Sequence, residues 1–388
     1  MKKNRYLYFT MLSLLALSLQ AQAQKGSTPR LVVNITIDQL KSDYPFLFDD
    51  GLVCEQGYYP YGQIDLSSAI SSVVTGTTPF YHTITADKWL DRESLQTIAA
   101  TPDYIAVSTL SDELKLATKG LGKVCAVATK KNTAALASGH NVDRLIWSED
   151  KKKEWNAISL TDKALQLIVQ ENLGYDSIPD ILYLNYDANP DKNALTKLVC
   201  KIEKLIGKDQ ALFVVTSTGY VDETNEDYAK YHIPTGIYYA NRTANFLNMY
   251  LGALWGQGKY VEGIYRQQIY LNHKLLEQKR ITLTDALQHS KEFLLQISGV
   301  KRVETHLYEQ HIGDLVVELN PGWQMQNDDT YEQIQVKKPL AYFPIIFYGA
   351  NLPAKKVVTP VSIEHIAATI AKTIRIRAPN ACVATPLF

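Results

Sequence analysis

The stretch Leu31-Val-Val-Asn-Ile-Thr-Ile37, followed directly by Asp38, decides how the rest of this 388-residue sequence is interpreted. A nearly continuous apolar run of this length is typical of a central strand that is buried on both faces of a parallel sheet. Ligands of open α/β sheets lie beyond the carboxyl ends of the strands. Asp38 is therefore the first candidate site residue, where a carboxylate can bind a metal, orient a base or cap a helix.

Further apolar runs predict strands of the same kind, and helical patterns separate them. The predicted strands are Tyr104–Val107, Val124–Ala128, Ile181–Leu184, Leu212–Val215 and Ile345–Tyr348, and the predicted helices are Thr109–Thr118, Leu160–Glu171, Asn193–Ile206 and Ser362–Arg375. This alternation predicts an α/β fold, a three-layer α/β/α sandwich. The stretch 227–322 is rich in Tyr, Asn and Gln and predicts a smaller accessory cap, inserted before the last core strand of one domain over 24–388.

The first residues predict an exported protein. Lys2, Lys3 and Arg5 precede a short apolar stretch, and Ala21-Gln-Ala23 supplies a cleavage site, so residues 1–23 match a secretory signal peptide. We expect a location in the periplasm or cell envelope of a Gram-negative bacterium. No later segment approaches the roughly 20 apolar residues of a spanning helix. The balance of 40 basic and 40 acidic residues gives no electrostatic case for binding nucleic acid.

The four cysteines show no C-x-x-C spacing, which excludes zinc-ribbon and thioredoxin-like sites. Cys125 and Cys200 lie in apolar or helical patterns and are predicted to be buried thiols. Cys54 and Cys382 lie beside turn-like segments, and in an oxidising compartment they could pair. Asp176-Ser-Ile178 is similar to the three-residue O-glycosylation acceptor of Bacteroidota.

Several motifs occur together in one order along the chain: Val32–Leu40, Thr75-Gly-Thr-Thr-Pro79, His82–Asp91, Lys123–Lys130, Ser138-Gly-His140, Gln268–Asn272, Phe343–Gly349 and Pro379-Asn-Ala-Cys382. In this order they resemble the alkaline phosphatase superfamily, in particular its PafA-like phosphatases and nucleotide pyrophosphatase/phosphodiesterases of Bacteroidota. That resemblance implies a hydroxyl nucleophile and two zinc ions held by Asp and His, which neutralise phosphoryl oxygens and activate the nucleophile.

Carried over position by position, the resemblance implies that most of this machinery is lost. Asp38 keeps a metal-ligand position, and Lys130 keeps a phosphate-contacting position. The substituted positions are Leu66 for the nucleophile, Asp87 for an Asn, Asn132 for an Arg, Ser217 and Thr218 for an Asp-His pair, and Tyr342 for the last His. One clear ligand cannot hold two zinc ions, so we expect no cofactor, no catalytic residue and no metal site.

These residues lead to three hypotheses. The first is a catalytically inactive pseudophosphatase that serves as a periplasmic binding or assembly component, with another envelope protein as its partner. The second is an exported metal-dependent phosphomonoesterase or phosphodiesterase that uses Ser67 or Ser68. The third, a carbohydrate-binding protein, rests only on the 24 tyrosines. Under the first hypothesis, we expect these site positions to lie together at the carboxyl ends of the strands. In place of a metal, Lys130 should supply a positive charge near Asp38, and Ser217 and Thr218 should donate hydrogen bonds to it.

Overall fold

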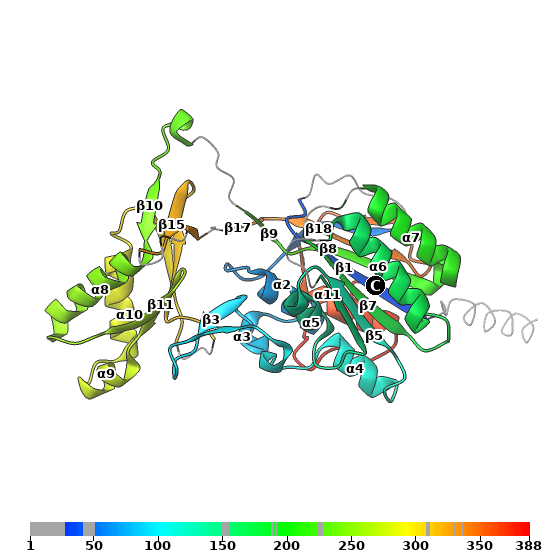
Figure 1. The fold of residues 1–388 in the computed structure, drawn as a ribbon, viewed down its shortest axis with the longest axis horizontal. Helices are drawn as coiled ribbons and strands as arrows, with labels where there is room; N and C mark the ends of the chain where they lie inside the picture. The colour runs from blue at the N-terminus through cyan, green and yellow to red at the C-terminus, as the bar shows by residue number, and fades with distance from the viewer. Residues whose placement is uncertain are drawn as a thin grey trace, which may run out of the picture.

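The computed structural model describes residues 28–41, 51–148, 155–187, 190, 192–222, 228–307, 311–328, 331, 333–334 and 337–388. The predicted signal peptide over 1–23 lies outside the described residues. In Figure 1 the chain forms a large lobe built on a central sheet and a smaller lobe to one side.

The central sheet has nine strands in the described part of the chain, and β1 (Leu31–Ile37) lies in its middle. β1 is parallel to β7 (Asp180–Tyr186) on one side and to β8 (Ala211–Ser217) on the other. Beyond them lie β5 (Val124–Ala128), β6 (Arg144–Trp147), β18 (Phe343–Gly349), β2 (Leu52–Tyr58), β19 (Lys355–Val357) and β20 (Val361–Ser362). The predicted central position of Leu31–Ile37 is confirmed, and the carboxyl ends of three parallel strands meet at one edge.

Helices cover both faces of this sheet, which confirms the three-layer α/β/α architecture (Figure 1). Alternate residues of β1 enter opposite cores, Val32 on one face and Leu31 and Val33 on the other, because successive strand side chains point to opposite sides. The first face carries α2 (Leu66–Thr75), α4 (Leu110–Ala117), α5 (Lys131–Ser138) and α11 (Glu364–Thr373). The second carries α6 (Ala157–Glu171) and α7 (Lys192–Ile206).

The smaller lobe is inserted before β18 and has a hydrophobic core of its own. It contains β10 (Gly236–Tyr239), α8 (Ala240–Trp255), β11 (Val261–Tyr265), β12 (Gln268–Leu271), α9 (His273–Gln278), α10 (Leu283–Leu294), β13 (Val300–Thr305), β14 (Leu315–Leu319), β15 (Trp323–Gln326) and β16 (Gln333–Ile334). β10 pairs with β15, and β15 with β16, so the lobe continues past Gly322, the boundary predicted for the cap.

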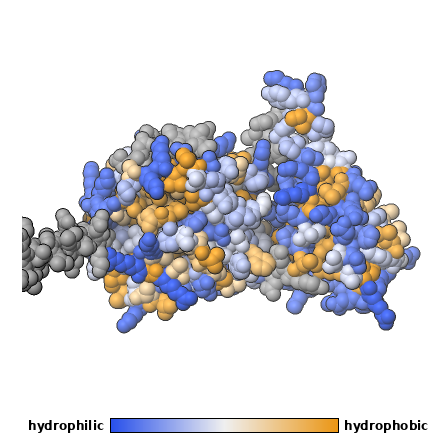
Figure 2. All heavy atoms as spheres, turned by 180° about the vertical axis from the view of Figure 1, so that it is seen from behind, coloured by the Kyte–Doolittle hydropathy of each residue, from blue (hydrophilic) through white to orange (hydrophobic). Residues whose placement is uncertain are grey.

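Two short ribbons and a short helix lie between the lobes. β9 (Tyr220–Asp222) pairs with β17 (Lys337–Pro339), and β3 (Lys88–Leu90) pairs with β4 (Thr97–Ala99). α3 (Pro79–His82) follows α2. The β3–β4 hairpin contacts the smaller lobe through Arg92, which binds Asp314 at 2.8 Å. Figure 2 shows polar and apolar residues interspersed over both lobes on the face it draws. Among the described residues, no helix has the length and apolar character needed to cross a membrane.

Two predictions about local structure are wrong. Tyr104–Val107 is not a strand: Pro102–Tyr104 forms a 3₁₀ helix, and Ala106 N–H donates to the His82 carbonyl at 3.3 Å, so the segment runs as a loop. Cys200 is exposed, because other residues of α7 form the face of the helix that packs against the core. Cys125 is buried, as predicted. All four cysteines are free thiols, so Cys54 and Cys382 do not pair in this structure.

Candidate functional site

The carboxyl ends of β1 and β8 bring together three of the residues that the sequence singled out. Asp38 follows β1, and its backbone N–H donates to the Tyr186 carbonyl of β7 at 2.8 Å. Ser217 ends β8 opposite Ile37, and the Thr218 N–H donates to the Ile37 carbonyl at 3.1 Å. Register in the parallel sheet therefore places Asp38, Ser217 and Thr218 side by side.

Asp38 is almost fully buried, with 5% of its surface exposed. The pKa of Asp38 is raised from 3.8 to about 7, chiefly by burial and also by the negative charge of the nearby Asp187. A hydrogen bond from Asn185 Nδ2 to Asp38 Oδ1, at 3.1 Å, and the charges of Lys130 and Lys337 act in the opposite direction. A carboxyl group in this environment takes up a proton more readily than it would in water.

Asp38 accepts a hydrogen bond from a protein side chain, and the donor is not one of the residues expected. Asn185 on β7 supplies the side-chain hydrogen bond. Ser217 Oγ instead accepts from the Gly219 N–H at 3.1 Å. The hydroxyl of Thr218 is buried without a hydrogen-bond partner among the described residues. Asn185 could not be predicted from the sequence, because a single Asn inside an apolar strand carries no signal beyond its place two residues before the strand-end Asp187.

The N-terminus of α2 is occupied by carboxylates of the chain itself. Asp65 caps the helix and accepts from the Leu66 N–H at 3.0 Å and from the Asp87 N–H at 2.9 Å. Asp87 in turn accepts from the Ser67 N–H at 2.9 Å. Helix N-termini attract anions, because their first N–H groups lack partners within the helix. Here the side chains of Asp65 and Asp87 take those donors, and Leu66 is a buried residue without a reactive atom.

Lys337, which no local sequence pattern marks as a site residue, forms ion pairs with both of these carboxylates. The Lys337 ammonium group binds Asp65 Oδ1 and lies 3.6 Å from Asp87 Oδ2. It also lies 4.4 Å from the centre of the Tyr220 ring, a cation–π contact. Burial lowers the pKa of Lys337 from 10.5 to about 8, and the negative charge of Asp38 opposes that shift. Lys337 comes from β17, about 270 residues after Asp65, so only the β9–β17 ribbon places it here.

The remaining predicted site residues, Lys130, Asn132 and Tyr342, are less closely connected to the residues described above. Lys130 is exposed at the N-cap of α5, and the Asn132 amide donates to the Ala100 carbonyl rather than to another site residue. Tyr342 precedes β18 and exposes 46% of its surface. In contrast, Tyr59 lies over the strand ends: its hydroxyl donates to the Ser217 carbonyl at 3.0 Å and its ring packs on Gly219.

The side chains gathered here do not fit a pair of zinc ions. Zinc sites in proteins use three or four nitrogen, sulfur or carboxylate donors for each ion. Among the described residues, no three His, Cys, Asp or Glu side chains form a group that could hold a metal ion. Asp65 and Asp87 already share an ammonium group, and Asp38 is bound by an amide. No step that depends on a zinc pair can be derived from this donor set.

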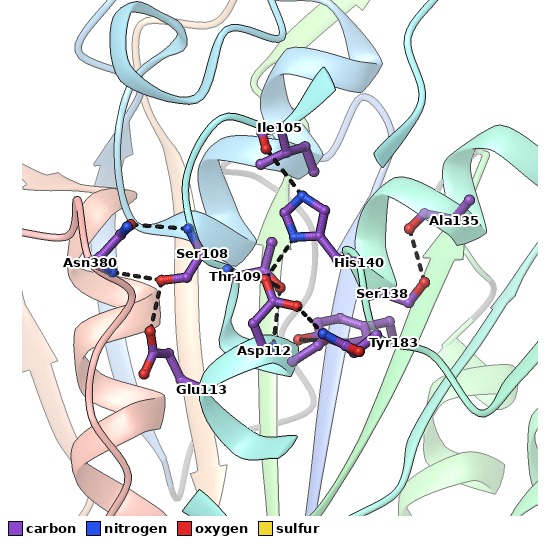
Figure 3. Close-up of polar contacts among 12 residues, drawn as sticks. Ile105, Ser108, Thr109, Asp112, Glu113, Ala135, Ser138, His140, Tyr183 and Asn380 are labelled. Atoms are coloured by element: carbon purple, nitrogen blue, oxygen red, sulfur yellow. Dashed lines mark hydrogen bonds and ion pairs between the residues drawn. The ribbon is translucent and has the colours of Figure 1, made fainter. Parts of the chain in front are cut away.

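His140 belongs to a separate polar network, shown in Figure 3. Its Nδ1 lies 2.8 Å from Asp112 Oδ2, and its Nε2 lies 3.1 Å from the Ile105 carbonyl. Both ring nitrogens are therefore bound to acceptors, and no hydroxyl group is placed for activation as a nucleophile. The nearby Ser138 hydroxyl donates to backbone carbonyls of its own helix. His140 thus joins the start of α4 to the end of α5, which is a structural role.

Part of the sequence is similar to known alkaline phosphatases. No protein-family model matches the chain. It is 27% identical over 158 residues to the alkaline phosphatase PhoV of Synechococcus elongatus and 25% identical over 175 residues to the alkaline phosphatase PafA of Elizabethkingia meningoseptica. These segments are 33% and 36% of this chain, but only 29% and 32% of the relatives, so the matches span about a third of their length.

Similarity to solved structures extends over nearly the whole chain. The crystal structure of wild-type PafA superposes with a TM-score of 0.78 and 16% identity, covering 93% of this chain and 98% of that one. Murine ectonucleotide pyrophosphatase/phosphodiesterase 5 superposes with a TM-score of 0.63 and 11% identity, covering 89% and 95%. At these identities the superpositions establish the fold, including the added smaller lobe.

Proposed function

We propose that this chain, a PafA-like member of the alkaline phosphatase superfamily, is a pseudophosphatase that acts as a binding or assembly component of the cell envelope. The observation that carries the proposal is the Lys337 ammonium group between Asp65 and Asp87 at the start of α2. A fixed cation there supplies the positive charge that a metal would otherwise bring. Leu66, at the position that the family resemblance gives to the nucleophile, cannot attack phosphorus.

Three further features support loss of catalysis. The helix N–H groups that would attract a phosphoryl group are bound to Asp65 and Asp87, and a phosphoryl anion would meet two carboxylates. The Tyr59 side chain occupies the space next to Gly219, just beyond the carboxyl end of β8. The hydroxyl of Ser68, one alternative nucleophile, exchanges hydrogen bonds with the Asp65 backbone at 2.9 and 3.0 Å as part of the helix cap.

The alternative function is a hydrolase with one metal ion, and one observation favours it. Around Asp38, three buried oxygens lack hydrogen-bond partners among the described residues: Asn185 Oδ1, Asp187 Oδ1 and Thr218 Oγ1. Buried oxygens are normally paired, and an all-oxygen donor set suits Mg²⁺ or Ca²⁺ better than zinc. Ser67, next to Leu66 in the sequence, would then be a candidate for the nucleophile role.

Elemental analysis with activity assays separates the two functions. The purified full chain is dialysed against buffer with and without Zn²⁺, Mg²⁺ or Ca²⁺ and assayed with a nitrophenyl phosphomonoester and a nitrophenyl phosphodiester. We expect no retained stoichiometric metal, and rates equal to those of the Asp38→Ala and Ser67→Ala variants prepared in parallel. Stoichiometric metal together with hydrolysis that both variants abolish would refute the pseudophosphatase proposal and establish the alternative.

The partner and the location can be tested in the same host. An affinity tag placed after Phe388 leaves the predicted leader intact. Fractionation should recover the protein from the periplasm or envelope, and mass spectrometry of the purified complex should identify a co-purifying envelope protein. Recovery in the cytoplasmic fraction at full length would contradict the exported location.

A further inference from the structure

A cavity of about 310 Å³ opens beside the candidate site, and its walls are built from tyrosine, proline and aliphatic residues. The lining residues that matter most are Tyr58, Tyr59, Tyr61, Pro339, Tyr342 and Pro360. Its volume is at the lower end of the range of small-ligand sites in proteins. It adjoins the candidate site through Tyr342 and through Tyr59, whose ring also packs on Gly219.

The walls of this tyrosine cavity are held in place before any ligand arrives. The Tyr59 hydroxyl donates to the Ser217 carbonyl, and its ring lies 5.3 Å from the ring of Phe343. Tyr61 meets Tyr59 edge to face at 5.5 Å, and its hydroxyl lies 2.8 Å from Ser72 Oγ. Leu340 is tied to Gly219 by a backbone hydrogen bond of 2.8 Å. A preorganised site of this kind loses little side-chain entropy when it binds.

The chemistry of the lining restricts the ligand. Among the residues that the structure describes, no charged side chain lines the tyrosine cavity, so these residues offer no partner to a phosphate, a carboxylate or an ammonium group. It also contains no Asn, Gln, Ser or Thr side chain, and the Tyr59 and Tyr61 hydroxyls are already bound. A sugar ring carries several hydroxyl groups, and each one desolvated without a partner costs about 1–3 kcal/mol. The lining therefore suits a neutral ligand with apolar rings and few donors.

We propose that the tyrosine cavity binds an extended, proline-containing peptide segment of a partner protein. Proline has an apolar ring and no backbone donor, and it leaves only carbonyl acceptors for the hydroxyl groups of Tyr58 and Tyr342. Polyproline II segments dock in aromatic-lined grooves elsewhere because they are already extended and little entropy is lost on binding. This inference rests on the proposed role as a binding component, and names the chemistry of its partner.

The test uses a proline decamer as the probe and the full chain as the receptor, in isothermal titration calorimetry and in tyrosine fluorescence. We expect saturable binding, and at least a tenfold loss of affinity in Tyr342→Ala, since truncation of an aromatic contact residue of a small site has an effect of this order. A second variant, Ala341→Asp, places a charge at the exposed edge of the cavity and should weaken binding similarly. Tyr81→Ala is the matched control, because Tyr81 is exposed to a similar extent and lies outside the cavity.

Each outcome decides the proposal. Saturation lost in both cavity variants and kept in the control supports it, provided that thermal melts show all three variants folded. Absence of saturation by the proline decamer, or equal binding by a Gly-Ser decamer, would overturn it. Saturation by a neutral oligosaccharide alone would overturn it in favour of carbohydrate binding. The assay does not depend on catalysis, so phosphatase activity in the earlier test would remove the pseudophosphatase proposal without altering this result.

Discussion

Replacing Lys337 by methionine tests whether its ammonium group holds the start of α2 together. Methionine keeps an unbranched apolar stem over the Tyr220 ring but removes the positive charge. Asp65 then loses its only ion-pair partner among the described residues, with 10% of its side chain exposed, while Asp87, at 35%, is better hydrated. The loss of this ion pair should therefore lower the free energy of unfolding.

The magnitude follows from two opposing contributions. Removing one partner of a buried ion pair costs roughly 3–5 kcal/mol, because the other charge is left uncompensated. Asp65 keeps its hydrogen bonds from Leu66 and Asp87, and Lys337 no longer has to be desolvated, a cost that its lowered pKa reveals. We therefore expect Lys337→Met to lower the free energy of unfolding by about 2 kcal/mol.

Urea unfolding followed by circular dichroism at pH 7 measures this difference. Lys338→Met is the matched control, because the next residue of the same short strand is exposed and its loss should change stability by less than about 0.5 kcal/mol. Adding Asp65→Asn to Lys337→Met should restore part of the loss, since asparagine still caps a helix without a charge. Equal stabilities of Lys337→Met and Lys338→Met would refute the role assigned to the ammonium group.

Three more predictions concern separate features of the fold. The pKa of Asp38 is raised to about 7, so its contribution to stability is fully present below about pH 4 and is lost as the pH rises through 7. Asp38→Asn does not titrate, so its free energy of unfolding in urea should rise by a few kcal/mol relative to wild type between pH 4.5 and pH 8. A difference between the two proteins that stays constant with pH would contradict the raised pKa. Gly219 has φ +76° and a Cβ there would lie 2.4 Å from the Tyr59 ring, so Gly219→Ala should cost about 2 kcal/mol or more in the same assay. Its control Gly252→Ala, in open space on α8, should stabilise slightly, and similar effects of both would contradict the close packing. Cys200 is the exposed cysteine, so a thiol reagent should label it first in the native protein. Because all four cysteines are free thiols, dithiothreitol should leave the melting temperature unchanged. A melting temperature lowered by dithiothreitol would reveal a disulfide.

The central strands could be predicted from the sequence because each is a short, nearly continuous apolar run that no other environment satisfies as well. β1, β5, β7, β8 and β18 all overlap the predicted runs. β2 was missed because Glu55 and Gln56 interrupt its pattern near the sheet edge. Tyr104–Val107 was predicted wrongly, since an apolar run of four residues does not distinguish a buried strand from a packed loop.

The sequence by itself also determined the position of Asp38, because a carboxylate directly after a central parallel strand lies at the sheet edge whatever the rest of the chain does. It could not identify Asn185 or Lys337. The contact of Lys337 with Asp65 depends on a ribbon that returns from the smaller lobe, and no local pattern in β17 specifies where that ribbon ends. Charge pairing across so long a separation is decided by the tertiary structure, because only the folded chain sets the distance between two groups that the sequence leaves independent.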